Sequence, residues 1–258
     1  MNDEILFEVN DGIAWLVFNR PQARNAMTFG MYDRLGELCK QINRDDTIKV
    51  LILRGAGDKA FVSGTDISQF RDFHTAEQAT SYEKKMDDVF DAVEDLRIPT
   101  IAAIQGACTG GGAGIAAACD LRVGAPSAKF GFPIARTLGN TLSTRNLSRL
   151  AGLVGVARTK DILLLARLMD AEEMKAIGLL NEITSENDLH ARAEAMARKL
   201  MEHAPITLRT TKQVLNEVLR SWAPESSSDH VIEAYTSADF KEGIDAFLGK
   251  RKPDWRGK

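Results

Sequence analysis

The sequence predicts an α/β fold, because short apolar runs of strand length alternate with longer segments of helical pattern. The runs near residues 50–53, 61–62 and 102–105 are typical of buried strands, and from about residue 155 helical patterns dominate. Alternation of this kind builds parallel β-α units with right-handed crossovers. The 258 residues suffice for one large domain or for a core with a small appendage.

The first elements have clear start and stop signals. Two β-rich runs, at 5–9 and 13–18, flank Asn10-Asp11-Gly12, a sequence typical of a hairpin turn. Thr28 is a candidate N-cap for a helix that we expect to reach about residue 42. The chain then returns through Asp45-Asp46 to the buried strand that begins at Val50.

The remaining elements follow from the same patterns, with breaks near Gly178, Pro205 and Pro224. We expect a further strand at 120–123, and helices at 66–71, 76–96, 155–168, 171–177, 188–203, 205–222 and 226–248. We place a boundary near residue 200, which divides a core of residues 1–200 from a C-terminal helical region of residues 201–258.

Composition excludes several classes of protein. The net charge is −3, and no long basic run precedes the last ten residues, so nothing indicates a nucleic-acid partner. No apolar run is long enough to span a membrane, and the acidic start of the chain is not typical of a signal peptide. Cys39, Cys108 and Cys119 form neither a paired spacing nor a metal pattern. We therefore expect a cytoplasmic protein with reduced thiols and no metal.

A glycine turn organises the chain. The apolar run at 102–105 breaks at Gly106, and an Ala-rich helical pattern begins at Gly110-Gly111-Gly112. Free N–H groups at a helix start form a site for negative charge, although glycines there also permit close helix packing. Neither the dinucleotide fingerprint nor the P-loop pattern fits this stretch.

A second turn has the same form. Another apolar run, at 61–62, ends in Ser63-Gly64-Thr65-Asp66 before a helix start. Two strand-to-turn exits, each with an unpaired amide, can aim two donors at one oxygen. That arrangement is an oxyanion hole.

At these residues the chain resembles the enoyl-CoA hydratase/isomerase, or crotonase, family. The resemblance covers nearly the whole chain, with several motifs in order. They are Asn19-Arg20-Pro21-Gln22-Ala23-Arg24-Asn25-Ala26, Ala60-Phe61-Val62-Ser63-Gly64-Thr65-Asp66, the Gly110-Gly111-Gly112 turn, Cys119-Asp120 and residues 242–252.

The resemblance implies a crotonase-like spiral of β-β-α units with a C-terminal helical region used for trimer assembly. The substrate would be an acyl-CoA thioester, with coenzyme A as part of the substrate and no separate cofactor. The oxyanion donors would be the backbone N–H groups of Thr65 and Gly111, and the assembly a homotrimer or a dimer of trimers.

We also expect a set of residues to bind the substrate, several of them because the resemblance implies it. They are Arg24, Ala26, Ser63, Asp66, Ile67, Gly110, Pro133, Arg136, Phe247 and Lys250. Arg24 would meet the CoA phosphates and pantetheine, and Phe247 and Lys250 would come from a neighbouring subunit. Arg136 would hold an anionic acyl group or form a surface ion pair, and Asp66 would stabilise a helix N-terminus.

Two departures concern the chemistry. Family hydratases carry glutamates at the positions held here by Gly114 and Ile134, and neither of these residues accepts a proton. Asn140 is a tentative catalytic residue that would orient a water or cap a loop. His74 is expected on a solvated loop.

Tyr82 and Glu83 lie on a helix from which they could reach the pocket, but we expect them on its solvated face. The reaction therefore stays open between hydration, double-bond isomerisation and thioester hydrolysis. A protein that binds acyl-CoA without turning it over is the alternative from another class.

Overall fold

The computed structural model describes residues 4–71, 73, 75–222 and 228–258. Within these residues two sheets form, and in both most neighbouring strands are parallel. The larger sheet has the order β1 (Ile5–Asn10), β2 (Ile13–Phe18), β3 (Val50–Gly55), β5 (Thr100–Ile104), β7 (Leu121–Gly124) and β10 (Glu182–Ile183). The smaller sheet has the order β4 (Ala60–Val62), β6 (Ala107–Thr109), β8 (Lys129–Gly131) and β9 (Met169–Asp170).

The two sheets are built from one repeated unit. Each of β3, β5 and β7 lies in the larger sheet and is followed at once by a strand of the smaller sheet and then by a helix. The strand pairs β4–β6 and β6–β8 are parallel, so the C-terminal ends of these strands meet at the same edge. This arrangement is the spiral of β-β-α units that the family resemblance implied.

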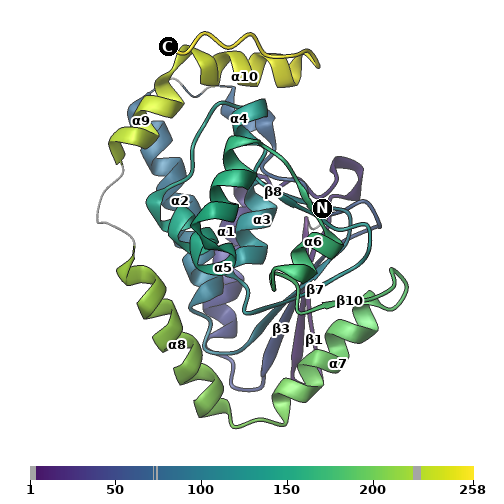
Figure 1. Cartoon of the computed structure of the whole chain (residues 1–258). Coiled ribbons are helices and arrows are strands. Elements are labelled where there is room, and N and C mark those ends of the chain that lie inside the picture. The colour runs from purple at the N-terminus through teal and green to yellow at the C-terminus, as the bar shows by residue number, and fades with distance from the viewer. Residues whose placement is uncertain (1–3, 72, 74, 223–227) are drawn as a thin grey trace.

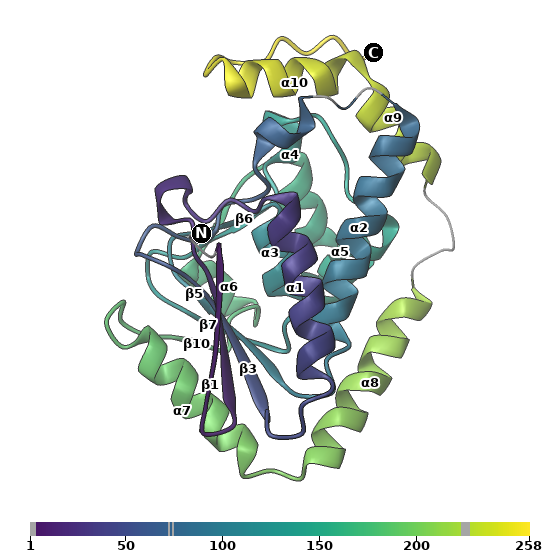
Figure 2. The same ribbon diagram turned by 180° about the vertical axis from the view of Figure 1, so that it is seen from behind.

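Helices cover both faces of the larger sheet (Figures 1 and 2). The helices of the described residues are α1 (Phe29–Ile42), α2 (Ala76–Glu94), α3 (Gly111–Ala118), α4 (Ile134–Thr137), α5 (Thr144–Leu164), α6 (Ala171–Ala176), α7 (Leu189–Met201), α8 (Pro205–Ser221), α9 (Ser228–Thr236) and α10 (Ala238–Leu248), with short 3-10 turns η1 (Pro21–Ala23) and η2 (Ile67–Phe70). The main core lies between the sheets and α1, α2 and α3, whereas α7 packs on the other face through Leu189, Ala193 and Ala197.

Local signals account for several helix boundaries. The Thr28 side chain accepts a hydrogen bond from the Met31 amide, as the N-cap prediction requires. Thr75 and Gln78 form a capping box at the start of α2. Each of these side chains satisfies a backbone N–H that the first helical turn leaves without a partner.

Three helix predictions need correction. The helix expected at 155–168 begins at Thr144, because Ser143 caps it, and Gly155 interrupts it with a φ of 78°. The helix expected at 226–248 is two helices, because Ser237 caps a new one, and its first two residues lie outside the described residues. The helix expected at 66–71 is the single 3-10 turn η2, which Asp66 caps.

The last part of the chain packs in two separate places. The proposed boundary at residue 200 falls at the end of α7, next to the turn before α8. In α8, Lys212 forms an ion pair of 2.7 Å with Asp120, whereas α9 and α10 pack over α2, η2 and α4 at the other end of the molecule (Figure 1). No helix among the described residues has both the length and the apolar character of a membrane span.

Candidate active site

The two turns singled out in the sequence touch each other. They follow β4 and β6, which are parallel neighbours in the smaller sheet. A Cβ atom on Gly110 would lie 3.4 Å from the Gly64 Cα atom, and a Cβ atom on Gly111 would lie 3.4 Å from the Thr65 hydroxyl oxygen. Residues 46 positions apart in the chain are thus brought side by side.

Each turn offers a backbone N–H without an acceptor. In the first turn, the Met27 amide donates to Gly64 O and the Asp66 amide donates to Met27 O, both at 2.8 Å. The Thr65 amide between them has no acceptor among the described residues, and neither has that of Gly111, the first residue of α3. The two touching turns therefore hold two backbone N–H donors that have no acceptor among the described residues.

A row of hydroxyl groups lies behind the turns. The Tyr32 hydroxyl is 2.9 Å from the Thr65 hydroxyl, which is 3.0 Å from that of Tyr82. A side chain at Gly111 would overlap the Tyr32 hydroxyl, so this position requires glycine. Burial raises the pKa of Tyr32 and of Tyr82, which keeps both phenols neutral.

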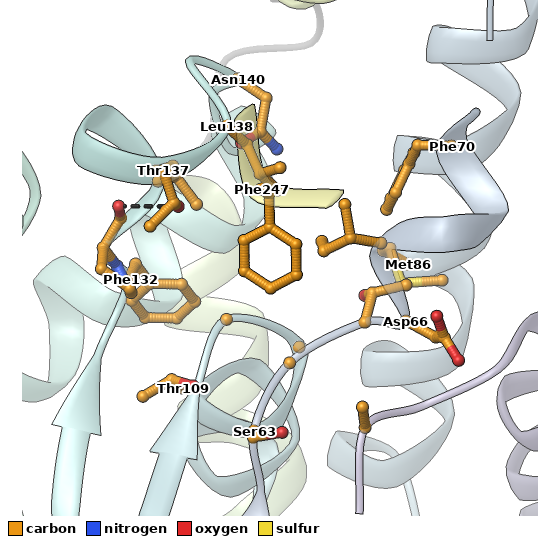
Figure 3. A pocket seen from close by; sticks show the side chains of 18 of the residues that line it. Ser63, Asp66, Phe70, Met86, Thr109, Phe132, Thr137, Leu138, Asn140 and Phe247 are labelled. Atoms are coloured by element: carbon orange, nitrogen blue, oxygen red, sulfur yellow. Dashed lines mark hydrogen bonds between the residues drawn. The ribbon is translucent and has the colours of Figure 1, made fainter. Parts of the chain in front are cut away.

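The turns form part of the wall of a cavity of about 910 Å³ (Figure 3). The predicted site residues that line it are Arg24, Ala26, Ser63, Thr65, Asp66, Ile67, Gly110, Gly111, Pro133, Asn140, Phe247 and Lys250. Arg136 is exposed and does not belong to the lining, so the structure does not support a role for it in holding an acyl group. His74 lies outside the described residues.

Phe247 and Lys250 line the cavity of their own chain. The reason is that α9 and α10 fold back over η2 and α4. Figure 3 shows the Phe247 ring directed among the other side chains of the lining. This ring is 52% exposed, which leaves it at the boundary between cavity and solvent.

The loop that carries Arg24 is held by a buried amide. The Asn25 side chain donates to the carbonyl oxygens of Ala56 and Ala60 at 3.0 and 2.8 Å, and it accepts from the Arg20 amide at 3.0 Å. These bonds fix the loop while the Arg24 side chain stays exposed at the cavity.

The sequence model of the enoyl-CoA hydratase/isomerase family matches residues 8–258. The chain belongs to this family. A short-chain-enoyl-CoA hydratase of Clostridium acetobutylicum is 32% identical over 253 residues, which are 97% of this chain and 96% of the relative. A crotonyl-CoA hydratase of Syntrophomonas wolfei is 32% identical over 99% of each chain.

A solved structure agrees with these relatives. The enoyl-CoA hydratase/carnithine racemase from Magnetospirillum magneticum has 35% sequence identity and a TM-score of 0.80, over 100% of this chain and 97% of that one. The crotonase-type α/β fold is thereby confirmed.

Neither Gly114 nor Ile134, the positions at which the resemblance implies glutamates in hydratases, carries a carboxyl group. A Cβ atom on Gly114 would lie 2.5 Å from the Phe90 ring, so this ring fills the volume that a longer side chain would need. Ile134 lines the cavity as an apolar residue. In this enoyl-CoA hydratase/isomerase family member, any carboxyl group at the cavity must therefore come from other positions.

Glu83 is such a group, and its expected place on a solvated face is wrong. Its side chain is only 6% exposed and lines the cavity together with Tyr82, Met86 and Phe90 of the same helix. Residues at spacings of three, four and seven share one face of a helix. In the sequence, the burial of Glu83 is indicated by its helical spacing from the apolar residues Met86 and Phe90.

Two hydrogen bonds hold the Glu83 carboxyl group. The Ser143 amide donates to Oε2 at 3.1 Å, and the Tyr235 hydroxyl donates to Oε1. Burial raises the pKa of Glu83 from its ordinary 4.5 to about 7, and the nearby Asp87 carboxyl adds to the rise, whereas both hydrogen bonds oppose it. The group therefore exists in both protonation states near neutral pH.

Asn140 is joined to this pair. Its Nδ2 donates to the Tyr235 hydroxyl at 2.9 Å, so this hydroxyl accepts from Asn140 and donates to Glu83. The Asn140 Oδ1 is buried and has no hydrogen-bond partner among the described residues. The Asn140 side-chain amide thus belongs to a hydrogen-bond network with Tyr235 and Glu83, rather than acting as a loop cap.

The raised pKa of Glu83 predicts a pH-dependent stability. A folded-state pKa of about 7 against an ordinary 4.5 means that the folded chain holds this proton more tightly. The stability that follows is complete below pH 4.5 and is lost as the pH rises through 7. From pH 5 to pH 8, wild type should lose about 2–3 kcal/mol relative to Glu83→Gln, measured as the free energy of unfolding in urea. Parallel changes in the two proteins would contradict the assignment.

Proposed function

We propose that this chain is an acyl-CoA enzyme that stabilises the enolate of a CoA thioester between the amides of Thr65 and Gly111. The observation that carries the proposal is the contact of two strand-to-turn exits, each with a free N–H, at the wall of a cavity. Preorganised backbone donors of this kind stabilise the negative charge that develops on an acyl oxygen.

The cavity suits an apolar acyl group with the CoA portion at its outer end. Its lining is rich in apolar and aromatic side chains, whereas the basic lining residues Arg24 and Lys250 are exposed. Charged phosphates favour exposed basic side chains, and an acyl chain favours apolar walls. The names of the two relatives, a short-chain-enoyl-CoA hydratase and a crotonyl-CoA hydratase, support an enoyl-CoA substrate.

Which reaction of the family the chain catalyses depends on the groups at the cavity that can transfer a proton. Two-glutamate hydration is disfavoured, because Gly114 and Ile134 replace the two carboxylates. Double-bond isomerisation and thioester hydrolysis are the alternatives. A purely binding protein needs no titratable group in the cavity, and the presence of Glu83 there favours an enzyme.

The role of the Gly111 amide can be tested with two matched variants. Tyr32→Phe removes the hydroxyl that a Cβ atom at position 111 would meet, and Gly111→Ala or Gly111→Pro is then added. Both double variants carry a Cβ atom, but only the proline lacks the N–H. Proline is also compatible with the first position of α3.

We expect the proline variant to bind acetoacetyl-CoA, which ionises readily to an enolate, about 10²–10³-fold more weakly than the alanine variant. Calorimetry would give the affinities, and circular dichroism would check the fold. Equal affinities in two folded variants would refute the role of this amide.

We also propose assembly as a homotrimer or a dimer of trimers, as the family resemblance implies. In support, α8 and the residue that follows it expose large apolar side chains, namely Ile206, Val214, Leu215, Val218 and Trp222. Light scattering should give three or six times the chain mass of 28.3 kDa. Val214→Glu with Val218→Glu should lower the mass, whereas the exposed Gln213→Glu should not. A wild-type monomer at micromolar concentration would contradict assembly.

A further inference from the structure

Few side chains at the cavity can move a proton. Among the described residues that line it, the carboxyl groups are those of Asp66 and Glu83. Asp66 caps η2, accepts from the Ser68 hydroxyl at 2.7 Å and pairs with Arg20 at 3.1 Å. These partners hold Asp66 as a charged structural group. Glu83 is therefore the candidate for proton transfer.

Glu83 lacks the partners of a structural carboxylate. It forms no ion pair with any described residue, although it is buried. A buried charge without a cation is costly to the fold, so a carboxyl group of this kind at a cavity is a candidate functional group. By contrast Glu94, on the same helix, pairs with Arg145 and Arg149.

The helix that carries Glu83 contacts the turn that carries one of the free amides. Tyr82, the neighbour of Glu83, contacts the Thr65 hydroxyl at 3.0 Å, so α2 is fixed against the turn that carries one of the two donors. One turn further along α2, Met86 lines the same cavity, and Phe90 follows. The helix thus presents a carboxyl group and an apolar wall to the same space as the amides.

The orientation of the carboxyl group is set from two other segments. Ser143, which caps α5, donates its amide to Oε2, and Tyr235 of α9 donates its hydroxyl to Oε1. Asn140 in turn donates to the Tyr235 hydroxyl. Both oxygens are therefore held, and the shift of the Glu83 pKa to about 7 supports a group that takes and returns protons at neutral pH.

We propose that Glu83 of α2 is the catalytic base and acid of this enzyme, with Tyr235 and Asn140 as its positioning residues. This inference rests on the proposed function. The carboxylate takes a proton from the α-carbon of the thioester, and the C–H electron pair moves into the enolate whose oxygen the Thr65 and Gly111 amides hold. The carboxylic acid then returns the proton to carbon. No electrons are gained or lost.

The test separates binding from proton transfer. Wild type, Glu83→Gln and the exposed α2 control Asp88→Asn are compared for butyryl-CoA binding by calorimetry and for exchange of its α-protons in D₂O by NMR. We expect all three to bind within a few-fold, and the Glu83→Gln exchange rate to fall at least about 10²-fold. Glu83→Asp, which keeps a carboxyl group, should retain part of the rate.

Tyr235→Phe tests the positioning role through the pH profile. The exchange rate should rise with pH as Glu83 loses its proton. Because the Tyr235 hydrogen bond lowers the pKa of Glu83, its loss should move this rise to higher pH. A merely structural role would lower the rate without moving the profile.

The outcomes are distinguishable. Absence of butyryl-CoA binding by wild type would overturn the proposed function, and the inference with it. Binding without α-proton exchange in wild type would overturn the inference alone, and so would a folded Glu83→Gln variant that binds and exchanges at the wild-type rate.

Discussion

The site depends on the contact between two turns that follow neighbouring parallel strands. Because β4 and β6 are paired, the amides of Thr65 and Gly111 end at one wall of the cavity. This contact leaves no room for side chains, since Tyr32 already fills the space beside Gly111. In the proposed mechanism the backbone therefore supplies the charge-stabilising donors, and the side chains around them can vary with the reaction.

The side chains of α2 show such variation. Phe90 occupies the volume next to Gly114, and Glu83, two turns earlier on the same face, brings a carboxyl group to the cavity. The helix α9 packs on α2 and contributes Tyr235, which contacts Glu83. The C-terminal helices thus complete the cavity of their own chain in addition to any role in assembly.

The sequence predicted what local signals encode. The hairpin, the helix cap at Thr28 and the two strand-to-turn exits all lie where expected, because each depends on neighbouring residues. The environment of Glu83 depends on Ser143 and Tyr235, which lie 60 and 152 residues away. No local pattern places those segments over α2, so the hydrogen-bond partners of Glu83 and the exposure of Arg136 became clear only in three dimensions.

A crystal structure of the protein with bound butyryl-CoA would test the roles of the two amides and of Glu83 together. We expect the thioester oxygen at about 3 Å from the backbone nitrogens of both Thr65 and Gly111. We also expect a Glu83 carboxyl oxygen within about 3.5 Å of the α-carbon. A thioester oxygen turned away from these amides, or an α-carbon separated from Glu83 by packed side chains, would contradict these roles.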